Sequence, residues 1–216
     1  MLISDSHKFI FLQMRKVAST SMQAILRPLC IPVPGGKLAH IKSRSRLEWD
    51  YHSYVFRTHD DILSAKRRMP VKKFENYFKF AFVRNPWDRL VSEYEYILKR
   101  PEHGRHKRVK GLKNFGEFIH MQIPRSDAYQ LNMLSDRKGR LLTDFIGKLE
   151  NLDQDWQIVC GRIGIPYQAL PRRNVTERQP YQVYYDAENI QLVAQHWARE
   201  IEQFDFAFTR LDQQPI

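Results

Sequence analysis

Residues 78–92 read FKFAFVRNPWDRLVS, and this stretch predicts the join between a buried strand and a helix. Residues 78–83 contain aromatic and β-branched residues with almost no polar interruption, which is typical of a strand buried on both faces. Pro86 suits the first turn of a helix, where its missing N–H group costs nothing, and Asn85 is a residue type that caps helices. Arg84 is therefore expected at the carboxyl end of the strand, where open α/β sheets bind ligands.

Arg84 has two interpretations on this evidence. An arginine beside a helix N-terminus makes an anion-binding site. Equally, Arg84 could pair with Asp88 one helical turn further on, as a structural ion pair. The stretch itself does not decide between the two.

The composition bounds the class of protein. With 216 residues and 43% hydrophobic content, the chain can build one full core, so we expect a single domain over residues 1–216. The formal net charge of +11 favours anionic partners, including nucleotides, acidic glycans and nucleic acid. Charge alone does not separate these partners.

Other sequence features point to a reduced, metal-free protein. Cys30 and Cys160 fit neither a disulfide framework nor a zinc pattern. No stretch approaches the roughly 20 apolar residues that span a bilayer. The start of the sequence lacks the basic and then apolar pattern of a signal peptide. We therefore expect a cytoplasmic protein without a transmembrane segment.

A second candidate ligand site follows the first predicted strand. Residues 7–13 predict that strand, and residues 19–29 predict a helix in which Ser19 and Thr20 are capping types. Between them lies a basic turn that contains Lys16. Backbone N–H groups, a lysine and hydroxyls can together hold a phosphate. The glycine-rich order of the usual P-loop is absent, so a capped helix with an exposed lysine is an equal alternative.

A histidine lies in the next predicted strand-end loop. Residues 54–56 predict a short strand, and residues 57–61 form the loop before a helix that extends to about residue 68. His59 would then lie at the carboxyl edge of the sheet, where a general base can reach a ligand. The histidines that compete for this role are His40, His52, His103 and His106.

The rest of the chain alternates between strands and helices. Residues 143–149 predict a strand or a loop, and the basic segment 99–113 predicts a solvated loop or an acceptor-binding loop. We expect helices over residues 87–98, 115–121, 127–134, 151–163 and 186–204. This alternation predicts an α/β fold with a mostly parallel central sheet flanked by helices.

Two separated segments resemble sulfotransferases of the carbohydrate type, the family-2 group. Residues 16–21, KVASTS, resemble the loop that binds the 5′-phosphosulfate in that family. Residues 80–94, FAFVRNPWDRLVSEY, look like the segment that binds the 3′-phosphate. Further similarity lies in residues 145–152, Asn174, Tyr184 and Tyr185.

The resemblance implies a P-loop-like α/β fold in one sulfotransferase domain, of the soluble bacterial type. It also implies the donor 3′-phosphoadenosine 5′-phosphosulfate (PAPS) and the product adenosine 3′,5′-bisphosphate (PAP). No metal is expected, because this transfer does not need one and no cluster of histidine, cysteine and carboxylate residues suggests one. Lys16 would contact the 5′-phosphate and the bridging oxygen, and His59 would be the catalytic base. Arg15 departs from the family, which commonly has proline there. The donor-binding residues implied are Arg15, Lys16, Ser19, Thr20, Ser21, Arg84, Ser92 and Arg178.

The expected function is the transfer of a sulfuryl group from PAPS to a hydroxyl of a carbohydrate or glycan-like acceptor. Like phosphoryl transfer, this reaction needs positioning and charge stabilisation more than covalent help. One alternative is a sulfotransferase of a small-molecule metabolite. Another is a basic protein that binds polyanions or nucleic acid without catalysis. A kinase is disfavoured, because no Walker loop accompanies Lys16.

Overall fold

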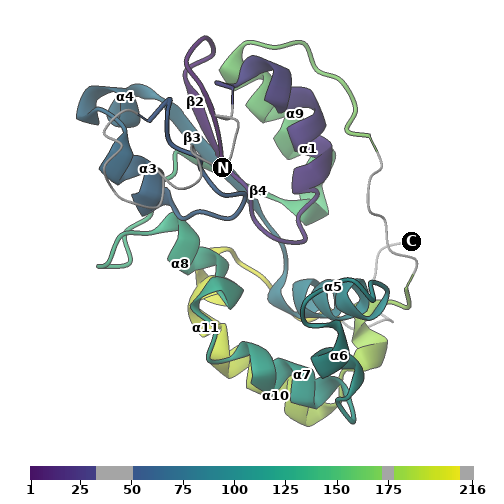
Figure 1. Ribbon diagram of the computed structural model, residues 1–216. Coiled ribbons are helices and arrows are strands. Elements are labelled where there is room, and N and C mark those ends of the chain that lie inside the picture. Colours follow the sequence, from purple (N-terminus) through teal and green to yellow (C-terminus); the bar gives the residue numbers. More distant parts are fainter. Residues whose placement is uncertain (33–50, 172–177, 210–216) are drawn as a thin grey trace. The chain divides into compact units, whose positions relative to one another are not determined.

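The computed structural model describes residues 1–32, 51–171 and 178–209, coloured in Figure 1. The chain divides into two compact units. The first unit comprises Met1–Val83 and Leu131–Arg173, and the second comprises Arg84–Gln130 and Asn174–Ile216. The boundary between Val83 and Arg84 therefore coincides with the predicted join between strand and helix.

The first unit contains a four-stranded sheet in the order β1-β2-β3-β4. Its strands are β1 (Leu2–Ser4), β2 (Phe9–Leu12), β3 (Phe78–Val83) and β4 (Phe145–Lys148). The last three strands are parallel, and β1 adds an antiparallel edge beside β2. The predicted α/β fold with a mostly parallel sheet is confirmed, and the open alternative for residues 143–149 is resolved as strand β4.

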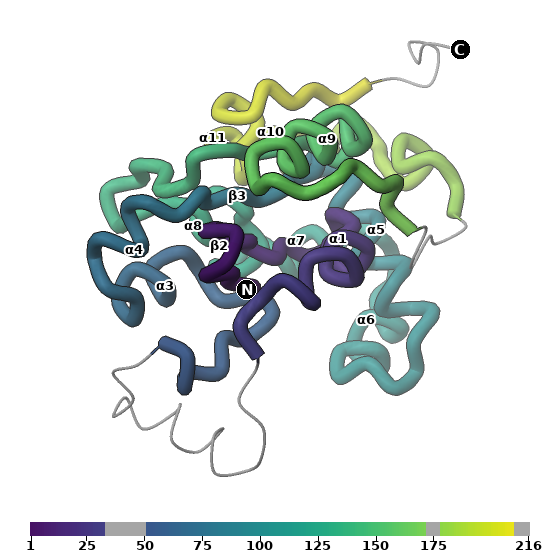
Figure 2. Tube along the Cα trace, turned by 90° about the horizontal axis from the view of Figure 1, so that it is seen from above, coloured from purple at the N-terminus to yellow at the C-terminus, as the bar shows by residue number. Residues whose placement is uncertain are grey.

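Helices cover both faces of this sheet. Helices α1 (Ser19–Leu26) and α9 (Leu152–Ile163) lie on one side, and α3 (Ile62–Arg68) and α4 (Val71–Asn76) lie on the other (Figures 1 and 2). Single 3-10 turns follow α1 and β4, as η1 (Arg27–Leu29) and η3 (Leu149–Asn151). Parallel strands with covered faces explain why β2 is a continuous apolar run and why β3 is apolar except at Lys79.

The core of the first unit is aromatic. All four residues of β2 are fully buried, and the ring of Phe11 stacks on Phe80 of β3 with centroids 5.0 Å apart. Gly147 in β4 faces the ring of Phe82, and a Cβ atom at this glycine would lie 2.5 Å from that ring. The close approach of β4 to β3 therefore requires glycine at this position.

The second unit is helical. Its helices are α5 (Pro86–Leu98), α6 (His106–Lys110), α7 (Phe115–Gln122), α10 (Ala187–His196) and α11 (Ala198–Gln203), with 3-10 turns η2 (Ser126–Ala128) and η4 (Tyr181–Tyr184). Helix α5 contacts α6, α7 and α10 around a core that includes Trp87, Phe118 and Trp197. As predicted, Asn85 caps α5, since its Oδ1 accepts the N–H of Trp87 at 3.1 Å. Helix α8 (Gln130–Leu134) begins at the last residue of this unit's first segment.

Four predicted elements differ in detail from the structure. Residues 54–56 form no strand, because Tyr54 packs instead on Phe56 and beneath the guanidinium of Arg68. The predicted loop 99–113 contains helix α6, which is anchored by the buried side chain of Val109.

The predicted helices 127–134 and 186–204 are each interrupted. The first becomes η2 and α8, with Tyr129 in an extended conformation between them. The second breaks at Trp197, whose fully buried indole donates its N–H to the carbonyl of Ala128 at 3.1 Å. This tertiary hydrogen bond fixes the backbone at Trp197 outside the helical region.

Among residues 1–32, 51–171 and 178–209, no helix combines the length and the apolar character needed to cross a membrane.

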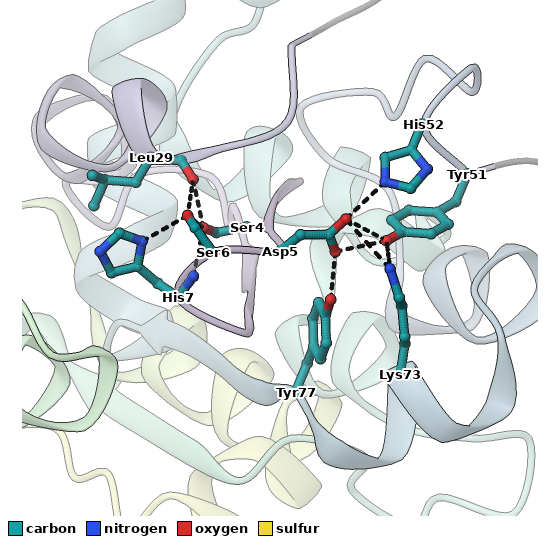
Figure 3. Close-up of polar contacts among 9 residues, drawn as sticks. All are labelled: Ser4, Asp5, Ser6, His7, Leu29, Tyr51, His52, Lys73 and Tyr77. Carbon is teal, nitrogen blue, oxygen red and sulfur yellow. Dashed lines mark hydrogen bonds and ion pairs between the residues drawn. The ribbon is translucent and has the colours of Figure 1, made fainter.

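A polar cluster lies around Asp5, in the turn between β1 and β2 (Figure 3). The Asp5 carboxylate accepts hydrogen bonds from Tyr51 at 2.6 Å, from His52 at 2.7 Å and from Tyr77, and lies 3.4 Å from the ammonium of Lys73. Burial alone would raise the pKa of Asp5. The hydrogen bonds and the lysine charge outweigh burial and hold that pKa well below its ordinary value.

Replacing this carboxylate should remove stability that depends on pH. The ionised form is favoured in the folded state, so its contribution is complete above the ordinary pKa of about 4 and is lost as the pH falls toward the folded-state pKa. We expect Asp5→Asn to lower the free energy of unfolding by about 1–2 kcal/mol at pH 7 and to flatten its dependence on pH below about pH 4. Urea unfolding at several pH values measures both effects. Glu75→Gln, at an exposed carboxylate of α4, is the control. If the free energy of unfolding of Asp5→Asn fell below pH 4 as steeply as that of the wild type, the prediction would be contradicted.

Candidate functional site

The loop after β2 has a backbone shape that suits an anion. Lys16 and Ala18 both adopt left-handed conformations, with φ of 64° and 59°. This conformation costs a non-glycine residue about 1–3 kcal/mol, and such strain concentrates at functional sites. Turns of mixed handedness direct backbone N–H groups into a concavity that binds anions. Here Lys16 and Ala18 take left-handed positions without glycine, which explains why the P-loop pattern is missing from the sequence.

Helix α1 begins directly after this loop. Its N-cap is Ala18, whose methyl group cannot accept a hydrogen bond, so the expectation that Ser19 or Thr20 caps the helix was wrong. The hydroxyl of Ser19 instead donates to the carbonyl of Met14 at 2.7 Å and closes the loop. The first N–H groups of a helix have no intrahelical acceptor and carry the positive end of its dipole. A phosphate at this end of α1 would supply that acceptor.

The predicted 5′-phosphate residues differ in their exposure. Arg15, Lys16 and Ser19 are half-buried, and Thr20 is exposed at the start of α1. Ser21 is only 3% exposed, so little of it is accessible to a ligand. The accessible cationic and hydroxyl groups of the loop are therefore concentrated at residues 15–20.

His59 lies against the start of the same loop. Its Nδ1 is 2.8 Å from the carbonyl oxygen of Gln13, the residue that follows β2. The turn that presents it is closed by a hydrogen bond of 2.8 Å from the N–H of Arg57 to Asp60. When Nδ1 donates its proton to the carbonyl, Nε2 is the nitrogen that can accept one. The structure thus brings His59 to the carboxyl end of β2, although the strand predicted before it does not exist.

The alternative histidines lie elsewhere. His52 belongs to the Asp5 cluster, which precedes β2 rather than following it. His103 and His106 are in the second unit, and Nδ1 of His106 is 2.9 Å from the carbonyl of Ile97. His40 lies outside the described residues, as does Asn174.

The second unit gathers two predicted arginines around Asp88. Nε and a terminal nitrogen of Arg84 each lie 2.7 Å from Oδ2 of Asp88, and Arg178 bonds to Oδ1 of the same carboxylate. The structural interpretation of Arg84, an ion pair with Asp88, is therefore confirmed. It does not exclude the ligand interpretation, because two guanidinium groups share one carboxylate and the trio keeps a net positive charge.

Two tyrosines hold the segment after Arg178 against α5. Tyr185 donates to the carbonyl of Trp87 at 2.9 Å, and Tyr184 donates to Glu95 at 2.9 Å. Burial and this bond to Glu95 raise the pKa of Tyr184 to about 12. These two bonds fix the late segment so that Arg178 reaches the first turn of α5.

Ser92 follows Asp88 by one helical turn and is 5% exposed.

Sequence reasoning missed the partners of these residues. The Gln13 carbonyl is 46 residues from His59, and Asp88 is 90 residues from Arg178. No pattern in the sequence links residues at such separations. Within the described parts of the chain, no three histidine, cysteine or carboxylate side chains gather as a metal site.

Comparison with known proteins finds relatives of this chain at low sequence identity. A protein of unassigned function from Archaeoglobus fulgidus is 32% identical over 120 residues, which cover 54% of this chain and 92% of that protein. Carbohydrate sulfotransferase 14 of Danio rerio is 24% identical over 76% of this chain, and that of Mus musculus is 31% identical over 43% of it. The chain spans only 48% and 22% of the lengths of these two proteins. No solved structure gives a significant match.

The family model described as the sulfotransferase family matches residues 1–207, which is nearly the whole chain. The predicted resemblance to the sulfotransferase family is thereby confirmed. This chain belongs to the sulfotransferase family.

Proposed function

We propose that the chain transfers a sulfuryl group from PAPS to a hydroxyl of a carbohydrate acceptor. Membership of the sulfotransferase family supports the reaction type. The two relatives named carbohydrate sulfotransferase 14 support a carbohydrate acceptor. The observation that carries the proposal is the strained loop at Lys16 and Ala18 in front of the uncapped α1, because its shape and charge fit a phosphate.

The 5′ end of the donor is assigned to this loop. The ammonium of Lys16 would neutralise the charge that develops on the bridging oxygen as the bond between sulfur and that oxygen breaks. The N–H groups at the start of α1 and the hydroxyl of Thr20 would hold the 5′-phosphate, with Arg15 adding positive charge.

The proton of the acceptor hydroxyl is assigned to His59. As the acceptor oxygen forms its bond to sulfur, Nε2 of His59 takes the proton from that oxygen. The contact of Nδ1 with the Gln13 carbonyl keeps the ring in the required tautomer and orientation. After transfer, the sulfated acceptor and PAP are released and the proton passes to solvent.

The 3′-phosphate is assigned to Arg84 and Arg178. Asp88 fixes both guanidinium planes before the ligand arrives, which reduces the entropy lost on binding. Arginine is suited to this role because its planar fork binds phosphate oxygens in pairs. Ser92, one turn along α5 from Asp88, is the third group assigned to the 3′-phosphate.

A thermal-shift titration with PAP tests the donor assignment. A ligand that binds only the folded state raises the melting temperature as its concentration passes the dissociation constant. We expect a rise with PAP and a much smaller rise with adenosine 5′-monophosphate (AMP), which lacks the 3′-phosphate. A flat response to PAP, together with a rise on adding heparin at low salt, would instead support a polyanion-binding protein.

A second experiment tests the acceptor class. Labelled sulfate should be transferred to a chemically desulfated glycosaminoglycan rather than to small alcohols.

A further inference from the structure

The side chain of Gln130 is hydrogen-bonded to the backbone of Arg84 at both ends of its amide. Oε1 accepts the N–H of Arg84 at 2.9 Å, and Nε2 donates to the carbonyl of Arg84 at 2.9 Å. Gln130 is 3% exposed and begins helix α8. Its amide thus bonds to Arg84 as a neighbouring strand would, one residue beyond the end of β3.

A buried carboxylate fixes the orientation of this amide. Nε2 of Gln130 also donates to Oε2 of Glu200 at 3.1 Å, and Glu200 is 1% exposed. A carboxylate that accepts this bond requires a donor opposite it, so the amide cannot flip without losing the bond. All three bonds agree on one orientation of the Gln130 side chain.

The neighbouring residue is held from another direction. Nδ2 of Asn85 donates to the carbonyl of Ala207 at 2.7 Å while its Oδ1 caps α5. The backbone of Arg84 and Asn85 is therefore fixed by residues that are distant in sequence. The side chain of Arg84 then extends from this fixed point to Asp88.

We propose that Gln130 is a positioning residue for the 3′-phosphate of the donor, acting through Arg84 and oriented by Glu200. The inference rests on the proposed function, in which Arg84 binds that phosphate. A guanidinium binds phosphate through two parallel hydrogen bonds, which demand a precise position of the arginine. Displacement of the Arg84 backbone would move the guanidinium out of register with the phosphate oxygens and leave the rest of the donor site unchanged.

The test compares the affinities of PAP and AMP by titration calorimetry, because their ratio isolates the contribution of the 3′-phosphate. Gln130→Glu keeps the size of the side chain and the acceptor for the Arg84 N–H, but removes the donor to Arg84 and to Glu200. In the combined variant, Gln130→Glu with Glu200→Gln, the new amide at position 200 can donate a hydrogen bond to the new carboxylate at position 130. The carbonyl of Arg84 still has no donor from position 130. Gln182→Glu is the control, since Gln182 is 8% exposed and donates to the carbonyl of Thr209 at 2.9 Å in the same unit.

We expect the combined variant to unfold near the wild-type temperature and to lose about tenfold in its preference for PAP over AMP, with AMP affinity changed by less than about twofold. The milder Gln130→Asn should show the same selective loss if Gln130→Glu fails to fold. Gln182→Glu should keep the wild-type preference. Folded Gln130 variants with an unchanged preference would overturn the positioning role and leave the proposed function standing. A wild-type protein that does not prefer PAP would overturn the 3′-phosphate assignment and this inference together.

Discussion

Lys16→Ala should fold normally and lose sulfuryl transfer by about 10³-fold. Removing a positioned donor that faces developing charge costs about 10²–10³ in rate, and the lysine adds a full positive charge to that effect. The substitution should not disturb the loop, because Ala18 already holds a left-handed conformation two residues further on. The measurement is the rate of transfer of labelled sulfate from PAPS to a chemically desulfated glycosaminoglycan, with folding checked by circular dichroism.

Lys8→Ala is a matched control for this variant. Lys8 is an exposed lysine that also has a left-handed backbone, with φ of 49°, but it precedes β2 rather than following it. The same change of charge and the same backbone strain are therefore tested at the other end of one strand. Lys8→Ala should keep wild-type activity. If both variants lost activity to the same extent, the loss would follow from the net charge of the protein, and Lys16 would be removed from the mechanism.

The fold was predictable wherever the periodicity of the chain agreed with its packing. The nearly unbroken apolar run at residues 78–83 indicated a strand covered on both faces, and the helices on either side of the sheet explain that run. The failures occurred where tertiary contacts override local preference. Tyr54 and Phe56 read as strand residues but pack on each other, and Trp197 ends a helix because its indole bonds to a distant carbonyl.

The candidate site could be predicted as residues but not as an arrangement. Lys16 and Arg84 were singled out because each follows a predicted strand, at the edge where open α/β sheets bind ligands. The left-handed backbone at Lys16 and Ala18 was not predictable, since glycine is the usual sign of such a conformation. Nor was the role of the Gln130 amide, because a buried glutamine has no sequence signature until its partner, the backbone of Arg84, is known.

His59→Ala should lower the turnover rate by about 10²–10⁴-fold while the affinity for PAP stays within about twofold of the wild type. The histidine is assigned to the acceptor proton, whereas Lys16 and the first turn of α1 are assigned to the donor. His59→Ala should therefore lower the rate alone, whereas Lys16→Ala should lower the rate and also weaken PAP binding. The measurement pairs the steady-state rate of transfer with the dissociation constant for PAP.

The pH profile and chemical rescue separate a base from a structural histidine. Histidine is protonated on the acid side of neutrality, where it cannot accept a proton, so the wild-type rate should fall there and the His59→Ala rate should not. Added imidazole should restore part of the lost rate in His59→Ala. His7→Ala is the matched control, because His7 is also half-buried and its Nδ1 is hydrogen-bonded, to Ser6 at 2.9 Å, in the turn before β2. A different result would contradict this role: the rate of His59→Ala still falls at acid pH and added imidazole does not raise it. The contact between His59 and the Gln13 carbonyl would then only support the loop, and another group would accept the proton.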